Sequence, residues 1–271
     1  MKRLMNQQPT RLMKVFLGML PFIIIISIYL MASNARLQEN ARDKLLPSVN
    51  SMANAVDKLA LQENKRTGEY TFWQDTASSM TRLAMGVGIA ALIGLTFGII
   101  NGAIPLVKTT FSPVITTISL IPPLALLPIL FIVFGLGELS KVVLIAIGIT
   151  PFIIRDLQEK VIELPSEQKI KAQTLGASTW QVIIRVIIPQ ILPRLITAVR
   201  LSLGAAWLFL IAAEAIASTD GLGYRIFLVR RYMSMDIIIP YVMWITFLAF
   251  LTDYLLRKIS ERAFPWFHTA R

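Results

Sequence analysis

The chain has 271 residues, of which 55% are hydrophobic and 16% charged, with a mean hydropathy of +0.64 and a formal net charge of +11. Soluble domains carry nearer a quarter charged residues and disorder needs low hydrophobicity, so this composition indicates an integral membrane protein. The absence of cysteine, together with a single histidine (His268) near the C-terminus, excludes disulfides and cysteine metal sites and argues against metal or serine–histidine catalysis.

The first apolar run covers residues 15–32. A span needs about 20 apolar residues, because each rises 1.5 Å through about 30 Å of hydrocarbon. The small residues at 31–35 would suit a signal-peptide cleavage site, but the run is longer than a usual signal sequence, so an uncleaved span is preferred. The connection that follows, residues 34–80, is electrically balanced. Its apolar residues between 49 and 60 recur at helical spacing, which predicts an amphipathic helix on the outer membrane surface or on the bundle.

The second apolar run covers residues 83–106 and is rich in glycine. Gly94, Gly98 and Gly102 recur every four residues, which places them along one face of a helix. Small residues on one face allow a neighbouring helix to approach closely. We therefore interpret this face as a packing stripe.

The third run, residues 111–134, is interrupted by Pro122, Pro123 and Pro128. Each proline removes a backbone donor, so this helix is predicted to be kinked or partly unwound. A fourth run, residues 142–154, is short for a span and crosses only if the charged side chains at its ends reach the interface. The fifth and sixth runs are residues 195–217 and 237–256.

Basic residues set the expected orientation. With six spans and the N-terminus inside, about 15 of the 27 Lys and Arg residues lie in cytoplasmic segments, among them Lys2 and Arg3 at one end and Arg271 at the other. The positive net charge then follows from the charge rule for membrane topology, without a nucleic-acid partner.

The segment 155–194 is the most informative cytoplasmic connection. Pro165 starts a new element, a helix follows to about Leu175, and Gly176 is suited to close it in the left-handed conformation. A second short helix, predicted over 178–188, begins with a possible Ser178 cap. We expect it to expose Trp180, Val182, Ile183 and Val186 and to end at Pro189 and Pro193. Such a hairpin suits either docking of another protein or packing on lipid headgroups, and physics alone leaves both open.

Residues 172–178 (Ala-Gln-Thr-Leu-Gly-Ala-Ser), followed by 186–189 (Val-Ile-Ile-Pro) and Pro193, resemble the signature of ABC importer permeases. The resemblance covers roughly residues 45–262 and is greatest to the nitrate, sulfonate and taurine branch of the binding-protein-dependent transport inner-membrane component family. One position departs from the signature: its glutamate falls on Ile170 and its first alanine on Lys171. The resemblance therefore implies the docking fold but no salt bridge from that glutamate to an ATPase.

The resemblance implies an all-α polytopic bundle of about six transmembrane helices with the type I ABC importer permease (MetI-like) fold. It implies one transmembrane domain, 1–271, divided into a tail and first span (1–33), an outer amphipathic connection (34–80), a permease core (81–257) with its coupling segment (155–194), and a cytoplasmic tail (258–271). Residues expected to contact the ATPase are Ala172, Thr174, Leu175, Gly176, Ala177, Ser178, Trp180 and Pro189.

The implied function is the permease subunit of an ATP-driven importer in the inner membrane, with both termini cytoplasmic. Its implied partners are a second permease copy, two cytoplasmic ATPases and an external binding protein. The chain has no Gly-x-x-x-x-Gly-Lys-Ser/Thr loop, so ATP and Mg are used by the partners, and we predict no enzyme activity, catalytic residue, metal or cofactor here. The solute is expected to be small and anionic, such as nitrate, taurine or another sulfonate.

The candidates for the translocation path are Pro122, Pro123, Arg200 and Glu214. Arg200 either faces an anion in the path or reaches lipid phosphate near the inner boundary, and the second interpretation is preferred. Glu214 and Asp253 are interpreted as helix-end or interhelical contacts. The alternative function is an ion-coupled secondary transporter, which should show repeats and ionisable residues at mid-membrane, and neither is visible in the sequence.

Overall fold

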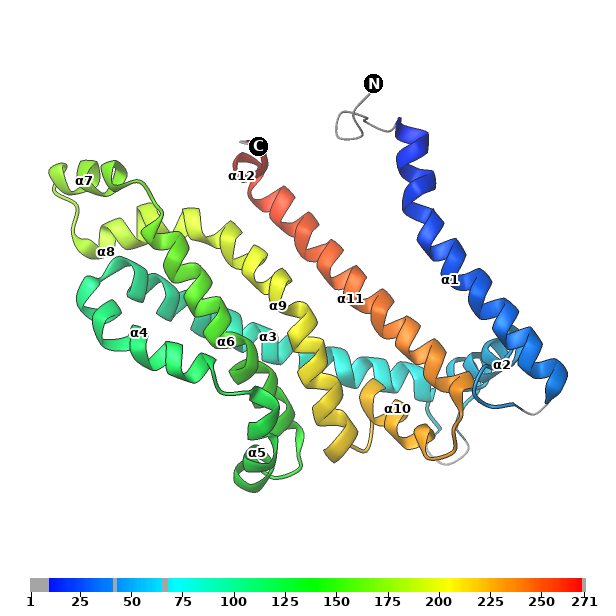
Figure 1. Cartoon of the computed structure of the whole chain (residues 1–271). Coiled ribbons are helices and arrows are strands. Elements are labelled where there is room, and N and C mark those ends of the chain that lie inside the picture. The colour runs from blue at the N-terminus through cyan, green and yellow to red at the C-terminus, as the bar shows by residue number, and fades with distance from the viewer. Residues whose placement is uncertain (1–9, 41–42, 65–67, 270–271) are drawn as a thin grey trace.

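The computed structural model describes residues 10–40, 43–64 and 68–269, and within those ranges the chain is helical with no strand. Lys2, Arg3 and Arg271, which entered the orientation argument, lie outside the described residues. The elements in chain order are α1 (Arg11–Glu39), α2 (Val49–Ala60), α3 (Thr71–Ala103), α4 (Pro105–Ser119), η2 (Pro123–Leu126), α5 (Leu127–Phe134), α6 (Glu138–Ile162), α7 (Ser166–Thr174), α8 (Thr179–Val182), η3 (Ile183–Ile187), α9 (Ile188–Ala217), α10 (Leu222–Arg230), α11 (Met235–Ala263) and α12 (Pro265–Thr269) (Figure 1).

Four helical stretches of the described chain are long and apolar enough to cross a membrane: α1, α3, the continuous stretch Thr179–Ala217, and α11. The bent pair α4 and η2–α5 makes a fifth if it counts as one span. The remaining expected span, the fourth run at residues 142–154, corresponds to α6, whose 25 residues reach about 37 Å. Helix α6 is long enough to cross a membrane but is not apolar enough to count with the four stretches above, because charged residues, such as Lys141 and Arg155, lie toward both ends of its apolar stretch.

Helices α3, α6 and α9 form the core of the bundle. The apolar side chains of α6 that are fully buried between its neighbours include Leu144, Ile145, Ile153 and Leu157. The predicted glycine stripe on α3 is confirmed as the surface on which α6 packs. A Cβ atom built on Gly94 would lie 2.4 Å from Ile153, so the two helices are closer there than any side chain allows.

Gly94→Ala is therefore expected to destabilise the protein by about 1–3 kcal/mol, because Ile153 must move in a tightly packed core. Gly88→Ala is the matched control: it lies on the same helix, and its Cβ meets no atom within 4 Å. The control should be neutral or more stable by up to about 1 kcal/mol, since alanine favours helix over glycine. Thermal unfolding of the two variants in detergent measures both, and equal behaviour would contradict the close packing.

The predicted interruption of the third run is confirmed. Helix α4 ends at Ser119, a turn of 3-10 helix begins at Pro123, and the axes on the two sides of this break differ by 82°. The proline ring at each of positions 122 and 123 removes a backbone donor, which accounts for the break. Only Ile104 separates the end of α3 at Ala103 from Pro105, which starts α4, so the second run is also divided by a proline.

The structure differs from the sequence analysis at the start of α3, which begins at Thr71, twelve residues before the predicted apolar run. This first part carries Asp75 and Arg82, whose charges are compatible with a buried helix because each has an oppositely charged partner. The predicted amphipathic helix is confirmed as α2, with a Ser48 side-chain cap.

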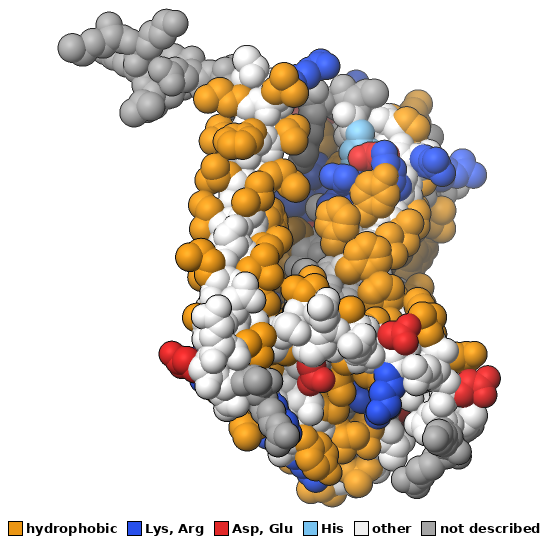
Figure 2. All heavy atoms as spheres, turned by 90° about the vertical axis from the view of Figure 1, so that its right-hand side faces the viewer, with side chains coloured by type: hydrophobic (Ala, Val, Ile, Leu, Met, Phe, Trp, Pro, Cys, Tyr) orange, Lys and Arg blue, Asp and Glu red, His pale blue; other side chains and the backbone are white. Residues whose placement is uncertain are grey.

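Helix α1 stands apart from the rest of the described bundle. Its large apolar side chains are nearly all exposed and form an almost continuous column in Figure 2. It contacts the connection to α2 through the Tyr29 hydroxyl, which donates to the Pro47 carbonyl at 2.7 Å, and through Ser33, which donates to the Leu46 carbonyl at 3.0 Å. Such an apolar surface suits contact with lipid or with another helix.

Candidate functional site

Helices α7 and α8 form a hairpin that projects from one end of the bundle. Figure 1 places α7 at the same end as α12 and the first turns of α1. As predicted, α7 stops just before Gly176, which has a φ of +84°, the left-handed conformation that favours glycine. At the tip, Leu175 is 88% exposed and Trp180 is 60% exposed. This tip presents large apolar side chains to its surroundings.

Local hydrogen bonds fix the shape of the hairpin. The Ala177 amide donates to the Ala172 carbonyl at 3.0 Å, which closes the turn after α7. The predicted Ser178 cap is confirmed and is reciprocal: the Ser178 amide donates to the Gln181 side chain at 2.7 Å, and the Gln181 amide donates to the Ser178 hydroxyl. The backbone beneath the exposed apolar tip is therefore fixed, because hydrogen bonds close the turn at the end of α7 and cap the start of α8.

The prediction that Pro189 and Pro193 end the second helix is wrong. Helix α8 continues through one π turn, η3, directly into α9, so both prolines lie within one helical stretch, Thr179–Ala217. A proline ring clashes with the carbonyl four residues before it, and the wider π turn that precedes Pro189 relieves that clash. Val182 and Ile183 are accordingly buried against the core, whereas exposure was expected.

The predicted ATPase-contacting residues divide between two places. Most of them lie in the hairpin: Ala172, Thr174, Leu175, Gly176, Ala177, Ser178 and Trp180. Ala172 and Ala177 pack partly against the core, whereas Leu175 and Trp180 point away from it. Pro189 is exposed at the start of α9, beyond the π turn.

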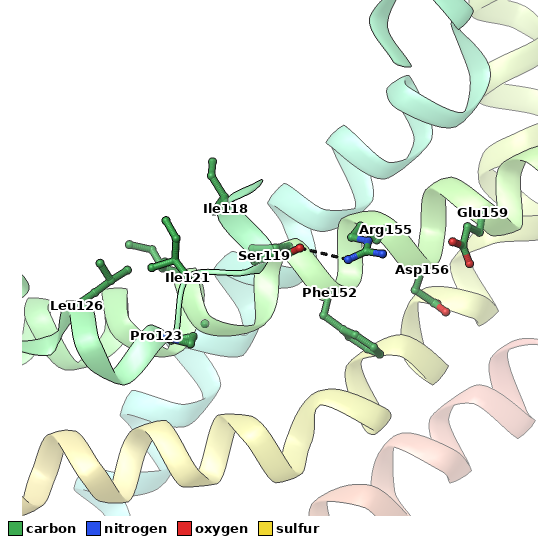
Figure 3. Close-up of a pocket in the computed structure, with 12 residues that line it drawn as sticks. Ile118, Ser119, Ile121, Pro123, Leu126, Phe152, Arg155, Asp156 and Glu159 are labelled. Atoms are coloured by element: carbon green, nitrogen blue, oxygen red, sulfur yellow. Dashed lines mark hydrogen bonds between the residues drawn. The ribbon is translucent and has the colours of Figure 1, made fainter. Parts of the chain in front are cut away.

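A cavity of about 380 Å³ lies where the α4–η2 break meets α6 (Figure 3). Pro123, one of the path candidates, lines it, whereas Pro122, which precedes it in the chain, is not among the lining residues. Arg155 extends from α6 into this region and donates to the Ser119 hydroxyl at 3.1 Å. The break in α4 therefore opens a space with polar groups at one end and apolar walls elsewhere.

Arg200 lies outside that cavity and forms an interhelical ion pair. Its Nε donates to Asp253 Oδ1 at 2.8 Å and its Nη2 donates to Asp253 Oδ2 at 2.9 Å, linking α9 to α11 in the bidentate arrangement that arginine and carboxylate favour. The interhelical contact proposed for Asp253 is confirmed.

Glu214 is fully buried at the other end of α9. Its carboxylate accepts hydrogen bonds from the Arg82 guanidinium at 2.8 Å, from the Ser79 hydroxyl at 2.8 Å and from the Gly223 amide at 2.8 Å. The interhelical contact proposed for Glu214 is confirmed, since Arg82 and Ser79 belong to α3.

Arg82 is the centre of a larger polar cluster that the sequence analysis missed. Its remaining nitrogens pair with Glu138 at the start of α6 and with Asp220 in the connection between α9 and α10. Burial disfavours the charged form of Asp220, but hydrogen bonds from Arg82 and Ser78 outweigh burial, so the pKa of Asp220 lies below its ordinary value. One arginine thus joins three parts of the bundle.

Asp75 forms the second half of this cluster. Its carboxylate accepts from Arg225 of α10 at 2.8 Å, from the Tyr241 hydroxyl of α11 at 3.1 Å and from the Gly221 amide at 3.0 Å. Asp75, Ser79 and Arg82 are four and three residues apart and so share one face of α3. That spacing is the sequence signal that could have indicated the cluster.

Comparison with known proteins gives a family match. Residues 90–264 match the family model described as "Binding-protein-dependent transport system inner membrane component". The taurine transport system permease protein TauC of Escherichia coli K12 is 37% identical over 196 residues, which is 72% of this chain and 71% of the relative.

Two further relatives and one solved structure agree with this match. The putative aliphatic sulfonates transport permease protein SsuC of Bacillus subtilis is 31% identical over 195 residues (69% of this chain, 68% of the relative). The bicarbonate transport system permease protein CmpB of Synechococcus elongatus is 29% identical over 245 residues (87% and 84%). The inward-facing MetNI methionine ABC transporter contains a chain that superposes with a TM-score of 0.60 at 20% identity, covering 74% of this chain and 97% of that one. The expected MetI-like fold is confirmed.

Proposed function

Since this chain belongs to the binding-protein-dependent transport system inner membrane component family, we propose that its α7–α8 hairpin is the surface on which the transporter's ATPase subunits act. The chain is the transmembrane permease subunit of an ABC importer, lies in the plasma membrane with several crossings, and is not an enzyme. It works with ATPase partners, which hydrolyse the ATP.

The observation that carries the proposal is the exposed apolar tip of the hairpin. Leu175 and Trp180 are large, apolar and exposed, yet the backbone beneath them is fixed by the turn at Gly176 and the capping box at Ser178. Rigid, exposed aromatic and aliphatic side chains are typical of protein-binding surfaces. The ATPase contact consists of Ala172, Thr174, Leu175, Gly176, Ala177, Ser178 and Trp180, with Pro189 at its edge.

This contact is apolar in character. The position at which the family signature has a glutamate is Ile170, which is exposed in the structure. Ile170, Leu175 and Trp180 therefore extend one apolar surface along the hairpin, so burial of apolar area stabilises the complex in place of a salt bridge. Lys169 and Lys171 flank this surface and add positive charge at its rim.

The geometry also provides a path for mechanical force. Helix α8 continues into α9 as one stretch of 39 residues, about 58 Å long. Val182 and Ile183 anchor its beginning in the core, and Glu214 near its end is paired with Arg82 of α3. Closure of the ATPases then moves the hairpin and this helix together as a rigid body, which alternates access to the path.

The proposal extends to assembly and orientation. The whole chain, 1–271, acts as one transmembrane domain, with the coupling segment 155–194 at its cytoplasmic end. The described ends of the chain lie at the same end of the bundle as the hairpin, so we place both termini in the cytoplasm (Figure 1). A second copy of this chain completes the path, and an external binding protein delivers the solute to the opposite side.

The proposed solute is small and anionic, of the nitrate, sulfonate or taurine type, by analogy with the relatives named for taurine, aliphatic sulfonates and bicarbonate. Pro122 and Pro123 contribute to the path by opening the break beside α6. Arg200 and Glu214 would face the solute only in a state that releases them from Asp253 and Arg82.

Cross-linking tests the ATPase contact. A cysteine introduced at Leu175 and alkylated with a photoactivatable maleimide reagent should link covalently to the ATPase subunit on illumination, because the tip is expected to lie against it. Failure of that link in an assembled, ATP-hydrolysing transporter would overturn the proposal.

A further inference from the structure

The outward face of α11 carries a row of aromatic side chains. Trp244 stacks on Phe247 with ring centroids 5.3 Å apart, and Phe250 stacks on Tyr254 with ring centroids 6.4 Å apart. Residues three and four positions apart share one face of a helix, so these rings form a single stripe along α11. Phe247, Phe250 and Tyr254 are exposed, so the rest of the described bundle leaves the stripe open to its surroundings.

Basic side chains continue this face beyond the last aromatic ring. Arg257 and Lys258 follow Tyr254 by three and four residues, and their charged groups lie 5.5 Å and 5.9 Å from the centre of its ring. Arg262 follows Lys258 by four residues and so lies one turn farther along. We call Arg257, Lys258 and Arg262 the α11 basic cluster. Figure 2 shows Lys and Arg side chains gathered at this end of the molecule, next to a mainly hydrophobic surface.

The α11 basic cluster carries more positive charge than its neighbours neutralise. Glu261 lies 3.1 Å from Lys258 and 3.9 Å from Arg257. Arg262 is exposed and forms no ion pair with a described residue. Three cations therefore meet one carboxylate, and the excess positive charge on this exposed surface is available to an anionic ligand.

The length of the apolar part of α11 places the cluster at the membrane surface. Residues 237–256 rise about 30 Å, which is the thickness of the hydrocarbon layer, so the cluster begins where the phospholipid headgroups begin. Just beyond it, α12 carries the exposed Trp266, and a contact of 3.1 Å between the Ser260 hydroxyl and His268 Nε2 holds α12 against α11. Tyrosine and tryptophan are both enriched at this interface.

This combination of an apolar stripe and a cationic end distinguishes between the molecules that could cover it. A helix from a second copy of the chain would suit the stripe but would need acidic residues opposite the cluster. Helix α1, which is exposed and apolar, instead begins with Arg11 and carries Lys14 at the same end of the molecule, so its charges would repel the cluster (Figure 1). A phospholipid with a net negative charge suits both parts of the surface.

We infer that this face of α11 binds an anionic phospholipid, with its phosphate against the α11 basic cluster and an acyl chain along Phe250 and Tyr254. Guanidinium groups bind phosphate oxygens in a bidentate manner, and the acyl chain covers the apolar rings. The inference goes beyond the proposed function, because it depends on the location of the chain in the membrane and not on the ATPase contact.

Phosphatidylglycerol is the probe for this site, and phosphatidylcholine with the same acyl chains is its matched control, because its headgroup has a phosphate but no net charge. Native mass spectrometry of the purified full-length chain in an uncharged detergent measures the affinity of the first lipid bound. We expect phosphatidylglycerol to bind more tightly than phosphatidylcholine by about tenfold or more. Inorganic phosphate in excess should not displace it, since phosphate has no acyl chain to cover the stripe.

The variants test whether the cluster is the cause. Arg257→Gln/Arg262→Gln leaves Lys258 paired with Glu261 and should lower the affinity for phosphatidylglycerol to that for phosphatidylcholine, which should not change. Arg257→Lys/Arg262→Lys keeps the charge and should keep the preference for phosphatidylglycerol. Arg230→Gln/Arg231→Gln, which removes two exposed cations between α10 and α11, is the matched control and should leave both affinities unchanged.

Four results would overturn the inference: equal affinity for the two lipids, unchanged phosphatidylglycerol affinity in Arg257→Gln/Arg262→Gln, displacement by inorganic phosphate, or phosphatidylglycerol that binds the monomer but is absent from a dimer. The third result would show a site for phosphate itself, and the fourth would show that a second copy covers this face. Because the assay contains no ATPase, each result leaves the cross-link at position 175 intact.

Discussion

Arg82→Met is expected to lower the free energy of unfolding by about 3–5 kcal/mol. The substitution leaves the carboxylate of Glu214, which is fully buried, without its cationic partner, and it also removes the link from α3 to Glu138 and Asp220. A buried charge without a partner is among the costliest single defects in a folded protein. Thermal unfolding of the purified variant in detergent measures the loss.

Two controls identify the cause. Arg257→Met removes an exposed ion pair with Glu261, in which the charges are 3.9 Å apart, and should cost no more than about 1 kcal/mol. Adding Glu214→Gln to Arg82→Met removes the stranded charge and should recover part of the lost stability. Equal destabilisation by the Arg82 and Arg257 variants would contradict a structural role for the buried cluster.

Gly176→Val is expected to abolish most solute uptake while membrane insertion stays normal. The backbone of Gly176 has a φ of +84°, and a β-branched residue there stores strain of about 1–3 kcal/mol. The exposed turn would relieve this strain by changing its conformation, which displaces Leu175 and Ser178 from their present positions. ATP hydrolysis should then continue without transport, and uptake assays in proteoliposomes measure the uncoupling.

Gly176→Asn is the matched control for this effect. No atom lies within 4 Å of a Cβ at position 176, so neither side chain meets steric hindrance and the two variants differ in backbone preference alone. Asparagine tolerates the left-handed conformation and should retain much of the coupling. Unchanged uptake with valine at this position would count against the hairpin as the site of force transfer.

Local sequence signals predicted the hairpin well because its structure depends on neighbouring residues. The stop at Gly176 and the cap at Ser178 each involve contacts within five residues, and both are present. The amphipathic pattern of α2 was equally local. The glycine stripe was also readable, since the spacing of Gly94 and Gly98 alone defines a face.

Interactions distant in sequence were not predictable in the same way. Arg82 and Glu214 are 132 residues apart, so nothing near Arg82 in the sequence indicates that its charge has a buried partner. Hydropathy counts the guanidinium as an unpaired charge and therefore placed Arg82 outside the second span. The same limitation affected α6, whose charged ends conceal a helix that is buried in the bundle. Pro189 shows the converse case: a local rule for helix ends failed because a π turn accommodates the proline.

Coupling of ATP hydrolysis to transport through this chain depends on which molecule touches the α7–α8 tip. The chain contains no cysteine, so a single cysteine replacing Leu175 is a unique attachment point for the cross-linking reagent. A cysteine replacing Leu136, which is 66% exposed, is its matched control, because it lies in the connection between α5 and α6, and Figure 1 places α5 at the opposite end of the bundle from α7. Cross-linking in the assembled transporter should join position 175 to the ATPase and leave position 136 free of it. A link at position 136 alone, or labelling of position 175 by a reagent confined to the outside, would contradict the account.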